Sequence, residues 1–111
     1  MTKKPQKYDV FQAIADPSRR KLLELLAGDE LSISTMCGHF TTSRTAVTKH
    51  LRVLELAGLV SSQKVGREKL YRLEAEPLQT MKQWLGFYDQ FWDDKLSKLK
   101  TIAENEQNKK Y

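Results

Sequence analysis

The pattern of apolar and polar positions is clearest in residues 41–59, TTSRTAVTKHLRVLELAGL. Its apolar residues recur at three- and four-residue steps and form one helical stripe, made by Val47, Leu51 and Leu54. Thr42 or Ser43 supplies the hydroxyl that an N-cap needs, and Gly58 stands where a left-handed cap ends a helix. The pattern predicts a capped amphipathic helix within this stretch.

The residues before this stretch predict two helices. Apolar residues at three- and four-residue steps in residues 8–15 favour a short amphipathic helix. Asp16 is a preferred N-cap and Pro17 is tolerated at the first helical position, so a second helix begins here. Its leucines form the buried face and Gly28 ends it. Arg19 and Arg20 project from its first turn, where we expect solvent or a surface ion pair rather than direct DNA contact.

Residues 31–42 predict a brief extended segment, a short helix and a turn. Residues 31–34 alternate like a short strand or an extended cap. Residues 35–40 can form one short helix, and Thr41–Thr42 is the turn into the next helix. A short helix, a tight turn and a longer polar-faced helix form a helix-turn-helix, whose second helix enters the major groove of DNA.

The residues after Gly58 predict a small β-hairpin. Gly66 and Arg67 supply its turn, and residues 70–73 alternate as a strand does. Its tip carries Lys64, Arg67 and Lys69. Beside a helix-turn-helix, a basic hairpin is typical of a wing that touches the flanking backbone or minor groove, and we prefer this to an ordinary charged hairpin.

The last predicted element is one long helix that begins at Pro77 and carries a nearly heptad apolar stripe. Such a stripe has more apolar surface than a small domain can cover, which favours a partner helix and a homodimer. The alternative is that part of the helix folds back onto the core. The residues assigned to dimerisation on this helix are Trp84, Leu85, Tyr88, Phe91, Trp92, Leu96 and Leu99.

The chain has 111 residues, which is enough for one domain, here expected over residues 8–104. Residues 1–7 are predicted to be a flexible arm and residues 105–111 a flexible tail. The formal net charge is +5, and residues 43–75 carry +4 of it, as seven Lys/Arg against three Glu. This distribution indicates a polyanionic partner for the predicted helix within residues 41–59 and the hairpin.

Composition and motifs argue against several other classes of protein. The single cysteine, Cys37, excludes an internal disulfide and cannot alone form a thiolate metal site. No apolar run approaches the ~20 residues of a membrane span and no hydrophobic signal region follows the charged start, so we expect a cytoplasmic protein. The sequence has no nucleophile–base pair and no glycine-rich phosphate loop, so we expect neither an enzyme nor a cofactor.

Several motifs occur together in the order of a known family. DPSRRKLLELL, VTKHLRVLELAGLV and GREKLYRL resemble the ArsR family of bacterial winged-helix regulators, over roughly residues 8–103. The ending LEAEPLQTMKQWLGFYDQFWDDKLSKL resembles a metal-independent branch of that family. The resemblance implies a mainly α fold of about five helices with a small β-hairpin wing. It also implies a homodimer on a palindromic operator with half-sites ~10 base pairs apart.

The resemblance also assigns roles to residues. The DNA-binding positions it implies are Ser43, Arg44, Thr45, Thr48, Lys49 and His50 on the recognition helix, with Lys64, Arg67 and Lys69 on the wing. His50, beside Val47 and Leu51, is also a candidate for packing. The first helix, including Phe11, is implied to join the last helix in the dimer interface.

The metal sensors of the family carry two cysteines on the helix before the recognition helix. This chain has Ser32 and Ser34 there, and hydroxyls are poor ligands for soft metals. The predicted last helix has aspartates but no histidine, although the other metal site of the family uses both. We therefore expect no metal site.

Two functional hypotheses follow from the sequence. The first is a dimeric, sequence-specific transcriptional repressor that occupies a promoter operator. The second is a winged-helix module that binds another protein through its aromatic last helix, with DNA binding incidental. The sequence does not identify a small-molecule effector.

Overall fold

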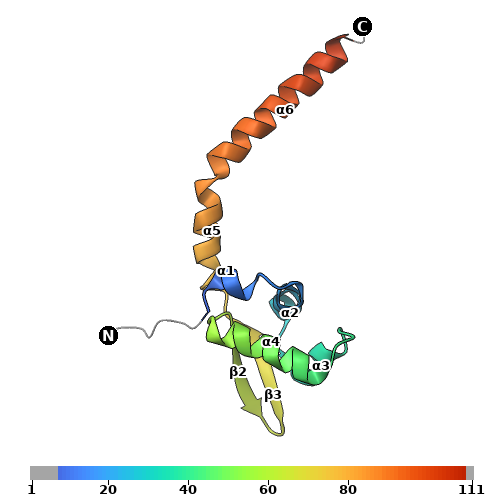
Figure 1. The fold of residues 1–111 in the computed structure, drawn as a ribbon, viewed down its shortest axis with the longest axis vertical. Coiled ribbons are helices and arrows are strands. Elements are labelled where there is room, and N and C mark those ends of the chain that lie inside the picture. Colours follow the sequence, from blue (N-terminus) through green and yellow to red (C-terminus); the bar gives the residue numbers. More distant parts are fainter. Residues whose placement is uncertain (1–7, 110–111) are drawn as a thin grey trace, which may run out of the picture. The chain divides into compact units, whose positions relative to one another are not determined.

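The computed structural model describes residues 8–109, which form six helices and a three-stranded sheet (Figure 1). The predicted arm, residues 1–7, lies outside the described residues. The chain divides into two compact units, residues 1–81 and residues 82–111. The first unit contains the helix-turn-helix, the sheet and the first turn of the C-terminal helical segment, where Leu78 and Met81 pack against the core; the second unit contains the rest of that segment.

The first two helices are set by their caps. Helix α1 spans Val10–Ala13, shorter than predicted, and a capping box between Asp9 and Gln12 begins it. Helix α2 spans Pro17–Gly28, as predicted, with Pro17 in its first turn. The side chain of Asp16 accepts hydrogen bonds from the backbone amides of Ser18 and Arg19 at 2.8 and 3.2 Å.

The segment between α2 and the turn differs from the prediction in its boundaries. Strand β1 is only Leu31–Ser32, and helix α3, Ile33–Cys37, begins and ends earlier than the predicted helix over residues 35–40. The reason is Ser32, whose hydroxyl accepts a hydrogen bond from the Thr35 amide at 3.2 Å and so caps the helix two residues earlier.

Helix α4, Arg44–Leu56, lies within the stretch that the apolar pattern predicts. Ser43 is its N-cap and accepts a hydrogen bond from the Ala46 amide at 3.1 Å. Gly58, just beyond the helix, has a φ of 76°, a left-handed conformation that glycine adopts without steric cost. Both ends of the helix are therefore confirmed.

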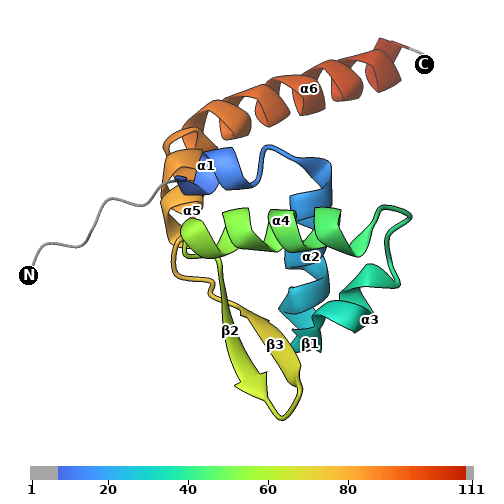
Figure 2. The ribbon, with the colours of Figure 1, turned by 60° about the horizontal axis from the view of Figure 1, so that its bottom comes forward.

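The predicted hairpin is confirmed as β2, Val60–Val65, and β3, Glu68–Leu73. The two strands are antiparallel, and Gly66 takes a φ of 63° in the turn between them. Strand β1 adds to the other edge of β3, so that the strand order is β1-β3-β2. Figures 1 and 2 both show the hairpin next to α4, which contacts β2.

The core of the first unit lies where α2, α3, α4 and β3 meet. Leu22, Met36 and Leu51 are fully buried, one from each of the three helices, and Tyr71 closes the core from β3. Burial of such side chains contributes about 1.5–3 kcal/mol each and holds α4 against the rest of the unit. The opposite side of α4 is left free to present polar groups.

The long C-terminal helix that the sequence predicts is divided in two. Helix α5 spans Leu78–Phe87 and helix α6 spans Asp89–Lys109. At the junction the Tyr88 amide donates to the carbonyl of Leu85, a three-residue step rather than the four-residue step of an α-helix. Gly86 has low helix propensity and accounts for the interruption at this place.

Helix α6 also continues into the segment predicted as a flexible tail. Residues 105–109 are helical, whereas residues 110–111 lie outside the described residues. The segment reads NEQNK, and its Glu, Gln and Lys are good helix formers, so an existing helix extends readily through it.

Candidate nucleic-acid interface

Helix α4 presents an exposed polar face opposite its buried stripe. Ser43, Arg44 and Thr45 at the start of the helix are exposed, and Thr48 and Lys49 follow one turn later. The face combines two cations with short hydroxyl groups, which suits phosphates and base edges respectively. The positive end of the helix dipole lies at the same end, which favours an anion there.

Two side chains of this face already make contacts within the protein. The guanidinium of Arg44 lies 3.4 Å from the hydroxyl of Ser34 on α3. Thr48 is exposed, and its hydroxyl donates to the Arg44 carbonyl at 2.8 Å, so this hydroxyl can serve an outside partner only as an acceptor. Arg44 is thus an exposed donor, and Thr48 is an exposed acceptor.

His50 differs from the other predicted DNA-binding residues of α4. Its side chain is only 25% exposed and lies beside α2, with Nδ1 4.0 Å from a carboxylate oxygen of Asp16. The same nitrogen lies 3.4 Å from Nη1 of Arg19. The structure therefore does not bring His50 together with the exposed residues of α4.

The three predicted wing residues are exposed around the hairpin turn. Lys64 and Lys69 face each other across the two strands, and Arg67 lies in the turn itself. Like charges on directly opposed positions destabilise a hairpin, so this pair favours a partner that supplies negative charge. The Lys69 ammonium also lies 5.4 Å from the centre of the Tyr71 ring, which orients its aliphatic chain.

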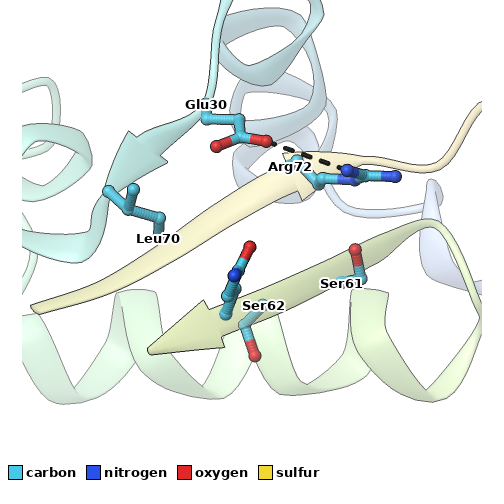
Figure 3. A pocket seen from close by; sticks show the side chains of 6 residues that line it. Glu30, Ser61, Ser62, Leu70 and Arg72 are labelled. Atoms are coloured by element: carbon cyan, nitrogen blue, oxygen red, sulfur yellow. Dashed lines mark ion pairs between the residues drawn. The ribbon is translucent and has the colours of Figure 1, made fainter. Parts of the chain in front are cut away.

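Charged residues on the outer face of the sheet form ion pairs with one another within the protein. A hollow of about 300 Å³ lies there, and Figure 3 shows Arg72 forming an ion pair with Glu30 at 3.9 Å. Arg72 also contacts Glu74 at 3.0 Å. Hydrogen bonds from Ser61 and then Arg72 lower the pKa of Glu74. Arg72 is therefore neutralised within the fold, although it belongs to the basic segment in the sequence.

The residues predicted to form a dimer interface are exposed in both units. Phe11 of α1 is 36% exposed in the first unit. In the second unit the apolar side chains of α5 and α6 are more exposed, with Trp92 at 60% and Leu99 at 61%. Phe87, which the sequence analysis did not single out, is 78% exposed. The full set of predicted interface residues on α5 and α6 is exposed: Trp84, Leu85, Tyr88, Phe91, Trp92, Leu96 and Leu99.

The serines at the positions of the metal-binding cysteines have other contacts. Ser32 caps α3, and Ser34 meets Arg44. Within residues 8–109, no three or more His, Cys, Asp or Glu side chains are grouped as a metal ion requires. In the same part of the chain, no helix combines the length and apolar character needed to cross a bilayer.

Sequence reasoning missed the roles of three basic residues of α2. Arg19 is half-buried and donates to the carbonyls of Gln12 and Ala13, whereas Arg20 is exposed to solvent, as expected, and also donates to the Ile14 carbonyl. Lys21 donates to the His39 carbonyl at 2.6 Å and stacks over Phe40. The missing signal is three-dimensional, because these acceptors are backbone carbonyls at the ends of other helices.

A helix-turn-helix followed by a basic hairpin defines a winged helix-turn-helix protein, a class that binds DNA. The family model for bacterial regulatory proteins of the arsR family matches residues 16–62. The transcriptional repressor SdpR of Bacillus subtilis is 35% identical over 77 residues, covering 69% of this chain and 86% of the relative. The HTH-type transcriptional regulator Rv2034 of Mycobacterium tuberculosis is 32% identical over 96 residues, covering 86% and 87%.

A solved structure is also similar to this chain in sequence and fold. The ArsR-like transcriptional regulator from Rhodococcus sp. RHA1 is 38% identical, with a TM-score of 0.67 over 86% of this chain and 88% of that one. This chain belongs to the arsR family of bacterial regulatory proteins. It is a DNA-binding transcriptional regulator with the winged-helix fold of that family.

Proposed function

We propose that this regulator is a sequence-specific repressor that binds a palindromic operator as a homodimer. The observation that carries the proposal is the exposed face of α4, where donors, acceptors and positive charge occur together opposite a fully buried stripe. Each α4 helix would read one half-site in the major groove, and the half-sites would be ~10 base pairs apart. Occupation of the operator would block access to the promoter.

The residues of α4 divide into two proposed roles. Arg44 and Lys49 supply donors that match the O6 and N7 acceptors of guanine, and one good base contact discriminates by about 1–3 kcal/mol. Ser43 and Thr45 supply hydroxyls for phosphates or base edges, and Thr48 offers acceptor lone pairs and a methyl group.

The wing residues have a different role in the proposal. Lys64, Arg67 and Lys69 would hold the DNA backbone or the minor groove beside the half-site. The opposed pair of Lys64 and Lys69 supports this role, because the repulsion between the two ammonium groups is relieved when a phosphate lies between them. Contacts of this kind add affinity on every sequence alike.

The exposed apolar residues of α1, α5 and α6 are the proposed dimer interface. Aromatic and aliphatic side chains that remain exposed along a helix are the usual core of an interface between protein chains. A two-fold axis through this interface explains why the operator should be palindromic. The regulator would act in the bacterial cytoplasm, where its operator is, and without catalytic activity of its own.

We further propose that the regulator does not sense metal ions. Ser32 and Ser34 carry hydroxyls, which bind soft metals poorly compared with thiolates. Both also have other contacts, because Ser32 caps α3 and Ser34 contacts Arg44. Operator affinity is expected to be unchanged by Zn²⁺ or arsenite at concentrations that saturate thiolate sites. A tenfold or larger loss of affinity with either would overturn this part of the proposal.

The test of the proposed function is quantitative binding to the protein's own upstream DNA and to a scrambled fragment, over a range of salt concentrations. We expect a specificity ratio of ~10³ or more and a steep salt dependence. Salt-sensitive binding without preference would contradict the repressor and favour the second candidate, a module that binds another protein through α5 and α6. A monomer that captures one defined partner would support that candidate.

A further inference from the structure

Arg19 joins three helices through one side chain. Its Nε donates to the Ala13 carbonyl at 2.5 Å, and its Nη2 donates to the Gln12 carbonyl at 3.2 Å. Its Nη1 lies 3.4 Å from Nδ1 of His50. Arg19 itself belongs to α2, Gln12 and Ala13 end α1, and His50 lies in the middle of α4. One guanidinium therefore connects α1 and α2 to the recognition helix.

The contact between Arg19 and His50 has a defined direction. Arginine has only donors, so in this hydrogen bond Nδ1 of His50 is the acceptor. Asp16 acts on this contact through Arg19: its carboxylate attracts the Arg19 guanidinium, and one of its oxygens lies 4.0 Å from Nδ1 of His50, beyond hydrogen-bond distance. That carboxylate is itself fixed, because it accepts the amides of Ser18 and Arg19 as the N-cap of α2.

The contact between Arg19 and His50 constrains the orientation of α4 in a way that apolar packing does not. The buried stripe of α4 holds the helix by apolar packing, which is not directional. A hydrogen bond to a planar ring, in contrast, is sensitive to small rotations and shifts of the helix. His50 follows directly after Lys49 in the helix, so a rotation that breaks its contact also turns the exposed reading face.

We propose that Arg19 and His50 are positioning residues that set the orientation of the recognition helix relative to α1, and thereby operator specificity. Neither needs to touch DNA. The inference rests on the proposed function, because it assigns the means by which the reading face of α4 is held in register. It changes the role of His50 from a DNA contact to a support behind one.

The experiment compares Arg19→Lys, His50→Ala and His50→Asn with wild type, on operator and scrambled DNA. Arg19→Lys keeps the charge but cannot hold α1 and His50 together, and His50→Ala removes the acceptor. Both variants should lower the specificity ratio about tenfold, because each removes the hydrogen bond that orients α4 and its free energy is of that order. His50→Asn should restore most of it, because its amide oxygen can accept where Nδ1 does.

The matched control is Arg20→Lys. Arg20 is the next residue of α2 and donates to the Ile14 carbonyl at 2.7 Å, but no contact joins it to α4 within the described residues. Its substitution should leave the specificity ratio unchanged. The double variant Arg19→Lys with His50→Ala should lose no more specificity than either single variant, because both remove the same contact.

The outcomes separate the inference from the proposed function. If wild type shows no operator preference, the proposed function fails, and the inference that rests on it fails as well. If wild type shows the preference and both Arg19→Lys and His50→Ala retain it, the positioning role is wrong. Equal losses on both DNAs, with a lowered melting temperature and no rescue by His50→Asn, would assign the cluster to stability alone.

Discussion

Arg44 and Arg67 are both exposed, but their surroundings predict different effects on DNA binding. Arg44 lies on the polar face of α4, whereas Arg67 lies in the turn of the wing. Arg44→Ala should weaken operator binding more than binding to scrambled DNA, because it removes a proposed base contact worth about 1–3 kcal/mol. Titrations on both DNAs measure this, and equal losses would contradict a reading role for Arg44.

Arg67→Ala is the counterpart of that variant in the wing. It should weaken binding to operator and scrambled DNA by the same factor, because the proposed phosphate contact of Arg67 is independent of sequence. The slope of log affinity against log salt should fall by about 1, as one fewer counterion is released. A loss confined to the operator would show that the wing reads bases.

Asp16 gives a prediction about stability and pH. Partial burial raises the pKa of Asp16, but the hydrogen bonds from the Arg19 and Ser18 amides and the nearby Arg19 guanidinium together lower it more, so the net pKa lies below its ordinary 3.8. A lowered pKa in the folded state means that Asp16 stabilises the fold fully above pH 3.8 and loses this contribution as the pH falls through the lower folded value.

Asp16→Ala should therefore cost about 1 kcal/mol of unfolding free energy at pH 7, as the loss of an N-cap does. Asp16→Asn keeps an oxygen for the cap and should cost less, while removing the titration. Urea unfolding at pH 7 and at acid pH measures both. If the difference in stability between wild type and Asp16→Ala did not shrink in acid, the assignment of the lowered pKa to Asp16 would be wrong.

At the scale of elements, the turn of the wing depends on one glycine. Gly66 has a φ of 63°, and no atom would obstruct an added Cβ, so only backbone strain opposes a substitution there. Gly66→Ala should cost about 1–2 kcal/mol, the strain of an L-residue in the left-handed region. DNA affinity should fall on operator and scrambled DNA alike, because the wing lysines lose their alignment.

Gly28→Ala is the matched control for the wing glycine. Its added Cβ would also meet no atom, and its φ lies outside the left-handed range. It ends α2, so alanine should leave stability unchanged or raise it by up to about 1 kcal/mol. Thermal unfolding of the two variants compares them directly. Equal changes in the melting temperature of the two variants would contradict backbone strain as the cause of the cost at Gly66.

At the scale of the whole molecule, the exposed apolar side chains of α5 and α6 predict a dimer. Trp92→Asp places a charge in the proposed interface and should separate the subunits, with loss of operator binding. Gln90→Asp, on the same helix but outside the apolar stripe, adds the same charge and should leave the dimer intact. Analytical ultracentrifugation measures both, and an intact Trp92→Asp dimer would remove this residue from the interface.

The sequence alone determined the helices α2 and α4, the hairpin and the family. Each of these elements rests on local chemistry: Asp16 and Pro17 begin a helix, Ser43 and Gly58 bracket another, and Gly66 makes a turn. Local signals of this kind act over a few residues, so they are readable in the chain itself. The basic segment that indicated DNA is likewise a property of composition.

The tertiary structure decided which of the charged residues remain available. Arg72 is neutralised by two glutamates, and Arg19 contacts both α1 and α4. In the sequence alone, neither can be distinguished from the exposed Arg44 and Arg67. The tertiary structure also turned His50 away from the exposed face of α4. Such assignments depend on carboxylates, carbonyls and rings brought close by folding from distant positions, because a charge interacts with what lies near it in space and not with its neighbours in sequence.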